Sequence, residues 1–366
     1  MPASLHEWIN HLNKQPLPAM ALTAQHVSEL MERPSTTNAD YQRIVARDPG
    51  FALSIFRHLG NLPRPPREPI TNIAHAVALA GMAPLEAGVN NLPLIKDRID
   101  VKGKRGLLAC YSQAVHAAQY LYQWAEFRRD PNADELMLGA LLHNCGEMAL
   151  WLQAPDQMSA IETQIKQGLS RESAFLAVYG FTHTQLSLGL AEAWALPPLI
   201  CESVSPGGAF QPRPLGIMLA CELARCSGSA WDSEQTMDLI ELAAEYCQQT
   251  TDQAAANIHR VSAETARQLQ GLHLPLSATE LLHLQPESEK AQQSTELQIN
   301  KTPVESLRNS DRITPADASL IRPSPSLADP DTPAPPTAKL LQQNPDPAIP
   351  AQIDSELFIE PDPEVI

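Results

Sequence analysis

Three side chains have the types and the spacing that chemistry needs. His143 and Asn144 are adjacent in the stretch LLHNCG at 141–146, and His183 follows forty residues later. An imidazole is the commonest metal ligand among side chains, whereas an amide oxygen carries no charge and holds a cation weakly. Two histidines and an amide do not complete a metal centre. We therefore favour the interpretation that these three are hydrogen-bonded core residues. The alternative is that they form a metal or ligand site.

Signatures of other chemistries are absent from the sequence. It contains no Walker loop, GxGxxG, HExxH, GxSxG or EF-hand loop. The six cysteines form no CxxC pair, which in a chain of 366 residues predicts reduced thiols instead of a disulfide framework. Cys145 has no adjacent Lys or Arg to activate its thiol, so we expect it to be buried and unreactive.

The chain is acidic, with 26 Lys and Arg against 42 Asp and Glu and a formal net charge of −16. Such a chain has no overall attraction for phosphate backbones, so nucleic acid is not expected as a partner. Basic side chains nevertheless gather between positions 64 and 105. They form a candidate anion-binding cluster, with a solvated loop face as the alternative: Arg64, Arg67, Lys96, Arg98, Lys102, Lys104 and Arg105.

Neither a secretory signal nor a membrane span is predicted. The first ten residues lack a basic stretch followed by an apolar one, and no run of 18 uncharged apolar residues occurs. Together with the unpaired cysteines, this indicates a cytoplasmic protein without membrane contact.

The elements that position these side chains are predicted to be helices. Apolar residues recur at helical spacing through the first 285 residues, without sustained alternation of period two. Asp48, followed by Pro49, and Ser170 have the sequence context of helix N-caps. We expect a long helix over 107–125 and one helix over 137–151 with Gly146 in its middle. The predicted fold class is all-α.

The C-terminal part of the chain has a different composition. Residues 286–366 contain 14 of the 33 prolines, one aromatic side chain and a net charge of −8. Such a segment buries too little apolar surface to fold, so we predict a disordered, acidic, Pro-rich tail. The apolar segment 353–359 is either a short docking peptide for a partner or an ordinary patch of the tail.

In the order and spacing of several short segments, the chain resembles the HDOD domain, the HD-related output domain of bacterial signalling proteins. The resemblance spans most of 12–205. It rests on IVARDP at 44–49, FR at 56–57, GN at 60–61, LLHNCG at 141–146, Glu172, YG at 179–180, His183, Leu190, Trp194 and LP at 196–197. It implies an HDOD-like helical domain over 1–205. The helical spacing continues beyond that domain and predicts a helical extension over 206–285, ahead of the tail.

The resemblance also indicates where a metal would bind in related enzymes. Catalytic HD phosphohydrolases hold one or two metals with a histidine, a His-Asp pair and a later aspartate, and the metal acidifies a water that attacks a phosphoester. Here Tyr111 stands at the first histidine position, Asn144 replaces the aspartate of the pair, and Ser205-Pro206 replaces a histidine pair frequent in HDOD proteins. His116 lies about 140° around the helix from Tyr111 and does not substitute for it. We expect no metal and no cofactor, and a remnant site formed by His143, Asn144, Tyr111 and His183.

These observations favour a non-catalytic signal-transduction or scaffold protein. It would bind a protein partner, or a small nucleotide-type ligand, through the HDOD-like domain. The alternative is a metal-dependent HD-type phosphohydrolase acting on a nucleotide or cyclic dinucleotide. A third interpretation is regulation in trans of a diguanylate cyclase or phosphodiesterase, because the chain carries no receiver, GGDEF or EAL-type segment of its own.

Overall fold

The computed structural model describes residues 2–63, 70–95, 100–228, 230–269, 271–272 and 274–275. All of them belong to the first of two units, Met1–Lys301; the second is Thr302–Ile366. The tail predicted over 286–366, with its apolar segment 353–359, lies outside the described residues. The regular elements of the described part are helices, with one isolated bridge between Ala19 and Leu94. The all-α fold class is therefore confirmed.

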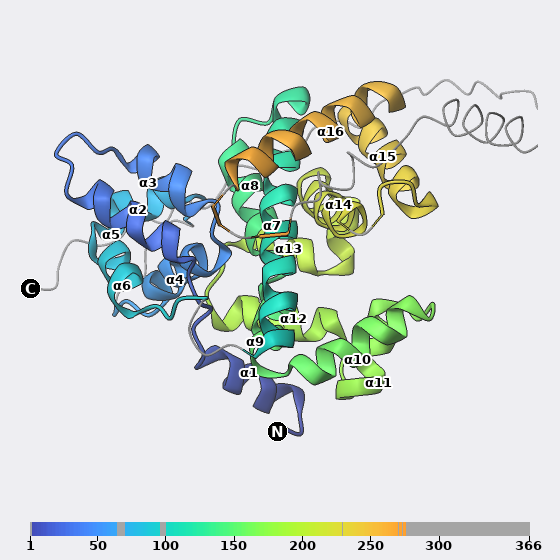
Figure 1. Ribbon diagram of the computed structural model, residues 1–366, viewed down its shortest axis with the longest axis horizontal. Helices are drawn as coiled ribbons and strands as arrows, with labels where there is room; N and C mark the ends of the chain where they lie inside the picture. Colours follow the sequence, from blue (N-terminus) through green and yellow to red (C-terminus); the bar gives the residue numbers. More distant parts are fainter. Residues whose placement is uncertain are drawn as a thin grey trace, which may run out of the picture. The chain divides into compact units, whose positions relative to one another are not determined.

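The first six helices are short, and α2 to α6 lie together on one side of the long helix α7 (Figure 1). Within this group α3 packs on α5, and α4 packs on α6. Their bounds are α1 (Leu5–Asn13), α2 (Ala21–Met31), α3 (Asn38–Val45), α4 (Pro49–Gly60), α5 (Ile73–Ala80) and α6 (Ala83–Asn91).

Helix α7 (Val101–Arg128) runs through the middle of the first unit and includes the long helix predicted over 107–125. It packs against α8, α9, α14 and α16, and buries Tyr111 and Tyr120 completely. The helices that follow it are α8 (Ala133–Leu142), α9 (Cys145–Gln153), α10 (Pro155–Lys166), α11 (Arg171–Tyr179), α12 (His183–Ala193) and α13 (Pro198–Val204).

The single helix predicted over 137–151 is wrong, because the chain forms two helices there. Helix α8 ends before His143, and α9 begins after Asn144, whose φ and ψ of −100° and 21° are not helical. Gly146 lies within α9 and does not end a helix. A Cβ at Gly146 would lie 3.3 Å from Oγ of Ser187 and 3.4 Å from Cδ1 of Leu190, so this glycine permits the close approach of α12. The break places His143 and Asn144 at a helix junction.

Both predicted helix caps are present. Asp48 accepts a hydrogen bond from the N–H of Phe51 at 3.0 Å, and Ser170 accepts one from Ser173 at 3.2 Å. The Asp48 carboxylate also accepts from the N–H of Met20 at 2.7 Å, across 28 residues of sequence. Asp48 is therefore a tertiary link between the segment before α2 and the start of α4, as well as a cap.

The helical extension predicted over 206–285 is present in its described part. It consists of the 3₁₀ helix η1 (Pro206–Phe210), α14 (Pro212–Ser227), α15 (Glu234–Cys247) and α16 (Thr251–Gln268). Helix α14 packs on α7, α8 and α13, and the Tyr120 hydroxyl of α7 is hydrogen-bonded to Ser262 of α16. The extension thus shares one hydrophobic core with the preceding helices.

The close contact of α7 with α9 depends on a glycine. A Cβ on Gly106 would lie within 2.1–2.5 Å of three ring atoms of Trp151. We expect Gly106→Ala to lower the free energy of unfolding by about 1–3 kcal/mol, because the indole must move to admit the methyl group. Urea denaturation followed by circular dichroism measures this loss.

The matched control is Gly207→Ala, since no atom lies within 4 Å of a Cβ at Gly207 and its φ is not positive. It should change the free energy of unfolding by less than about 0.5 kcal/mol. Equal stabilities of the two variants would contradict the packing role of Gly106.

Candidate functional site

A cavity of about 390 Å³ lies where the α8–α9 junction, α11, α12, α13 and α14 meet. This is within the usual range for small-molecule sites. One part of its lining is polar and comes mainly from the junction and from α9, α11, α12 and α14: His143, Asn144, Glu147, Arg171, His183, Thr184, Ser203, Glu222 and Arg225. The rest is mainly apolar and comes from α13 and α14: Val204, Leu215, Met218, Leu219 and Cys221.

The hydrogen bonds of Ser203 determine the tautomer of His143. The Ser203 hydroxyl donates to the carbonyl of Ile200 at 2.9 Å, so its oxygen accepts from the Nδ1–H of His143 at 3.1 Å. Nε2 of His143 then keeps its lone pair. Burial, followed by the proximity of His183, lowers the pKa of His143 to about 4, so the imidazole is neutral at physiological pH.

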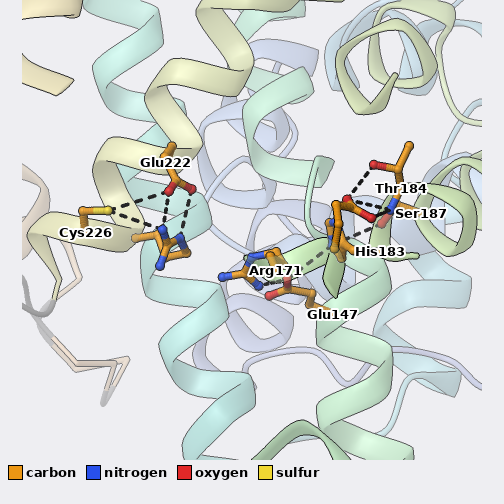
Figure 2. Close-up of polar contacts among 9 residues, drawn as sticks. Glu147, Arg171, His183, Thr184, Ser187, Glu222 and Cys226 are labelled. Atoms are coloured by element: carbon orange, nitrogen blue, oxygen red, sulfur yellow. Dashed lines mark hydrogen bonds and ion pairs between the residues drawn. The ribbon is translucent and has the colours of Figure 1, made fainter. Parts of the chain in front are cut away.

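Glu147 joins α9 to α11 and α12. Its Oε1 accepts a hydrogen bond from Nη1 of Arg171 and lies 3.3 Å from Nε2 of His183 (Figure 2). Only 8 % of the Glu147 side chain is exposed. Burial acts to raise the pKa of Glu147, but the charges of Arg171 and His183 outweigh it and hold the pKa below its usual value. Glu147 is therefore an ionised carboxylate paired with an arginine.

A second ion pair lies along α14. Glu222 accepts two hydrogen bonds from Arg225, through Nε at 2.9 Å and through Nη2 (Figure 2). The hydrogen bond to Arg225 is among the forces that hold the pKa of Glu222 below its usual value, although burial opposes it. The cavity is thus bordered by two carboxylates and two guanidinium groups, whose formal charges cancel.

The structure brings together three of the four residues predicted to form the remnant site. His143, Asn144 and His183 border the cavity, whereas Tyr111 does not line it. Tyr111 is fully buried and donates its hydroxyl hydrogen to the carbonyl of Pro18 at 2.8 Å. Its role is to attach the N-terminal segment to α7. The structure therefore does not bring Tyr111 to the cavity that the other three residues border.

His116 also does not line the cavity. It is fully buried on α7, and its Nδ1–H donates to the carbonyl of Ser112 at 2.8 Å. Burial lowers the pKa of His116. It is a neutral core histidine.

The candidate anion-binding cluster is only partly described. Arg64, Arg67, Lys96 and Arg98 lie outside the described residues. Lys102, Lys104 and Arg105 are exposed at the start of α7, and Lys102 pairs with Asp156 at 2.8 Å. None of these three lines the cavity beside His143 and His183.

Sequence reasoning missed the charged residues of the cavity. Glu147 follows His143 by four positions, and Arg225 follows Glu222 by three, so each spacing gives a weak local signal. Nothing local relates Arg171 to Glu147, which are 24 residues apart on different helices. Packing alone brings them into contact.

The sequence profile of the HDOD domain matches residues 17–206, more than half of the chain. The chain belongs to the HDOD family. The matched region therefore spans α2 to α13, whereas all of α14, including Glu222 and Arg225, lies beyond it.

Solved structures share the HDOD fold of this chain at low sequence identity. The MmoQ response regulator of Methylococcus capsulatus strain Bath superposes with a TM-score of 0.54 at 17 % identity, over 67 % of this chain and 98 % of that protein. A virulence factor of Campylobacter jejuni subsp. jejuni gives a TM-score of 0.51 at 15 % identity, over 76 % of this chain and 98 % of that one. No curated protein matched in the sequence comparison.

The donor set of this HDOD domain does not fit the metal centre of catalytic HD phosphohydrolases. Glu147 is paired with Arg171, and Nδ1 of His143 is bonded to Ser203. The hydroxyl of Tyr111 donates a hydrogen bond to the carbonyl of Pro18, away from the cavity. In the described ranges, no group of three His, Cys, Asp or Glu side chains is arranged to hold a metal ion. Cys145 is buried, and burial raises the pKa of its thiol far above the ordinary value, as expected for an unreactive cysteine.

None of the described helices is both long and apolar enough to cross a bilayer. The absence of a predicted span is consistent with this finding.

Proposed function

We propose that this protein is a non-catalytic signalling module that recognises a partner or a small ligand through the cavity beside His143 and His183. The HDOD family membership and the fold shared with a response regulator support a signalling role. Because fold alone does not define function, the main support comes from the site itself.

The observation that carries the proposal is the pairing of Glu147 with Arg171. A divalent cation beside an HD-type histidine needs a carboxylate charge to hold it, and here Arg171 already neutralises the charge of Glu147 by donating to its Oε1. The neutral His143 and Asn144 supply no charge to compensate. A water in this cavity therefore has no cation to acidify it, and hydrolysis of a phosphoester lacks its nucleophile.

The first test measures metal content and hydrolysis together. Protein purified without chelators should contain less than about 0.1 equivalent of transition metal by inductively coupled plasma mass spectrometry. It should not hydrolyse bis(p-nitrophenyl) phosphate when manganese is added. His143→Ala should leave both results unchanged, because the proposal gives His143 no metal to hold.

Stoichiometric metal that disappears in His143→Ala would establish a metal centre and reject the proposal. Turnover that requires manganese and His143 would favour the phosphohydrolase instead. His116→Ala is a matched control, since His116 is a histidine outside the cavity. Residual turnover shared by both variants indicates a contaminant and leaves the proposal standing.

The protein partner is addressed by affinity purification with mass spectrometry. We expect Leu215→Ser, at the rim of the cavity, to weaken capture of a signalling component, with Met237→Ser as a matched exposed control on α15. Leu215 is 38 % exposed and Met237 is 50 % exposed. Equal capture by both variants would place the partner surface elsewhere.

A further inference from the structure

The two arginines of the cavity do not use all their hydrogen-bond donors. Arg171 donates to Glu147 through Nη1, and within the described part of the chain its Nε and Nη2 donate to no other group. Arg225 donates to Glu222 through Nε and Nη2. Within the described part of the chain, its Nη1 donates to no other group. A guanidinium has five N–H donors in one plane, so a carboxylate on one edge fixes the direction of the remaining edge. Both residues border the same cavity.

The two guanidinium groups carry like charges on the lining of one cavity. Burial and the like charge of Arg225 act to lower the pKa of Arg171, and the Glu147 carboxylate outweighs them. Arg171 is 21 % exposed and Arg225 27 % exposed, so both charges are partly removed from water. An oxyanion between them would relieve this repulsion and accept the free N–H groups.

The rest of the lining has a different character. Val204, Leu215 and Met218, from α13 and α14, present aliphatic side chains to the cavity. Inorganic phosphate alone would leave this surface exposed to water. An apolar group attached to the anion would cover this surface, and the favourable binding free energy would increase with the apolar area buried.

We propose that the cavity binds a small organic anion, whose carboxylate or phosphate group lies between Arg171 and Arg225 and whose apolar body covers Leu215 and Met218. This inference rests on the proposed function, since it names the ligand class of the same site. Glu147 and Glu222 orient the arginines and do not contact the ligand head. His143 supplies a neutral acceptor, Nε2, at the polar end of the cavity.

The test is isothermal titration of the full-length protein at pH 7.5 with four probes. Phenyl phosphate and benzoate carry both features, whereas phenol lacks the anion and inorganic phosphate lacks the apolar body. At least one of the first two should bind at one site with a dissociation constant on the order of 1 mM, as expected for a fragment of about 11 atoms or fewer. Phenol and inorganic phosphate should bind at least about tenfold more weakly, because each makes only half of the contacts.

Variants locate the binding. Arg225→Gln should weaken the better probe about tenfold or more, and Leu215→Ser should weaken it severalfold while leaving the response to inorganic phosphate unchanged. Glu222 is 40 % exposed, so its loss of a partner in Arg225→Gln is compatible with folding, which circular dichroism checks. The matched control is Arg260→Gln, which also removes an arginine from a Glu pair, but on the exposed face of α16. Its affinity should equal that of the unmodified protein.

The outcomes separate the two proposals. Failure of both anions to bind, equal binding of phenol, equal binding of inorganic phosphate, or full affinity of Arg225→Gln would each overturn the ligand class. None of these would affect the non-catalytic role. Binding of phenyl phosphate followed by manganese-dependent release of phenol would instead overturn the non-catalytic role. If just one of the two anions binds, the result identifies the preferred head group and supports the inference.

Discussion

An Arg171→Met variant is expected to lose about 3–5 kcal/mol of its free energy of unfolding. The substitution removes the guanidinium that neutralises Glu147 and leaves that carboxylate with only 8 % of its side chain exposed. His183, whose Nε2 lies 3.3 Å away, is a weak substitute because burial lowers its own pKa. Urea denaturation at pH 7.5, followed by circular dichroism, measures the loss.

The double variant Glu147→Leu/Arg171→Met should recover most of this stability. With both charges removed, the site becomes apolar, and replacement of a buried ion pair by hydrophobic side chains is often neutral. Arg260→Met provides the comparison, since its pair with Glu264 is exposed on α16 and should contribute less than about 1 kcal/mol. A double variant as unstable as Arg171→Met would mean that the unpaired carboxylate is not the cause.

Asp48→Ala is expected to lower the free energy of unfolding by about 2–4 kcal/mol. It removes the acceptor of two backbone N–H groups, those of Met20 and Phe51, in a fully buried position. Ser170→Ala removes a comparable N-cap from α11, but Ser170 is exposed and makes no distant link, so about 0.5–1 kcal/mol is expected. Equal losses in the two variants would reduce Asp48 to an ordinary cap.

The loss caused by Asp48→Ala should also depend on pH. Burial raises the pKa of Asp48 from 3.8 to about 6, against the lowering effect of its hydrogen bonds. The folded state therefore holds this proton more tightly than the unfolded state, so the stability that the proton provides is lost as pH rises through 6. The cost of the substitution should be larger at pH 5 than at pH 7.5 by about 1.4 kcal/mol, the equivalent of one pKa unit.

Urea denaturation at both pH values tests this difference. A cost that increases with pH would mean that the backbone N–H groups outweigh burial and stabilise the ionised form. Ser170→Ala serves again as the control, because it removes no titratable group and its cost should not change with pH.

Much of the fold could be predicted because helix formation is local. Apolar spacing identified the helical class, and cap residues placed the starts of α4 at Pro49 and α11 at Arg171. The same reasoning was wrong between 137 and 151, where it predicted one helix and the chain forms two, separated at His143 and Asn144. The role of Gly146 is to admit α12, and this contact involves residues about forty positions away.

The candidate site could be predicted only in part. The resemblance to the HDOD domain directed attention to His143, Asn144 and His183, and all three border the cavity. The position of Tyr111 was inferred by analogy with a ligand position, but its hydroxyl is bonded to Pro18, 93 residues earlier in the chain. Analogy identifies a position in the sequence and does not determine where the side chain points.

The sequence by itself determined the helical class, the family resemblance and the incomplete set of metal ligands. Each depends on residue types at fixed, short spacings. Only the tertiary structure decided that Arg171 neutralises Glu147 and that Arg225 borders the same cavity. The reason is that the charge of a buried site is the sum over side chains from separate helices. Their packing, and not their spacing along the chain, brings those charges within a few ångströms of each other.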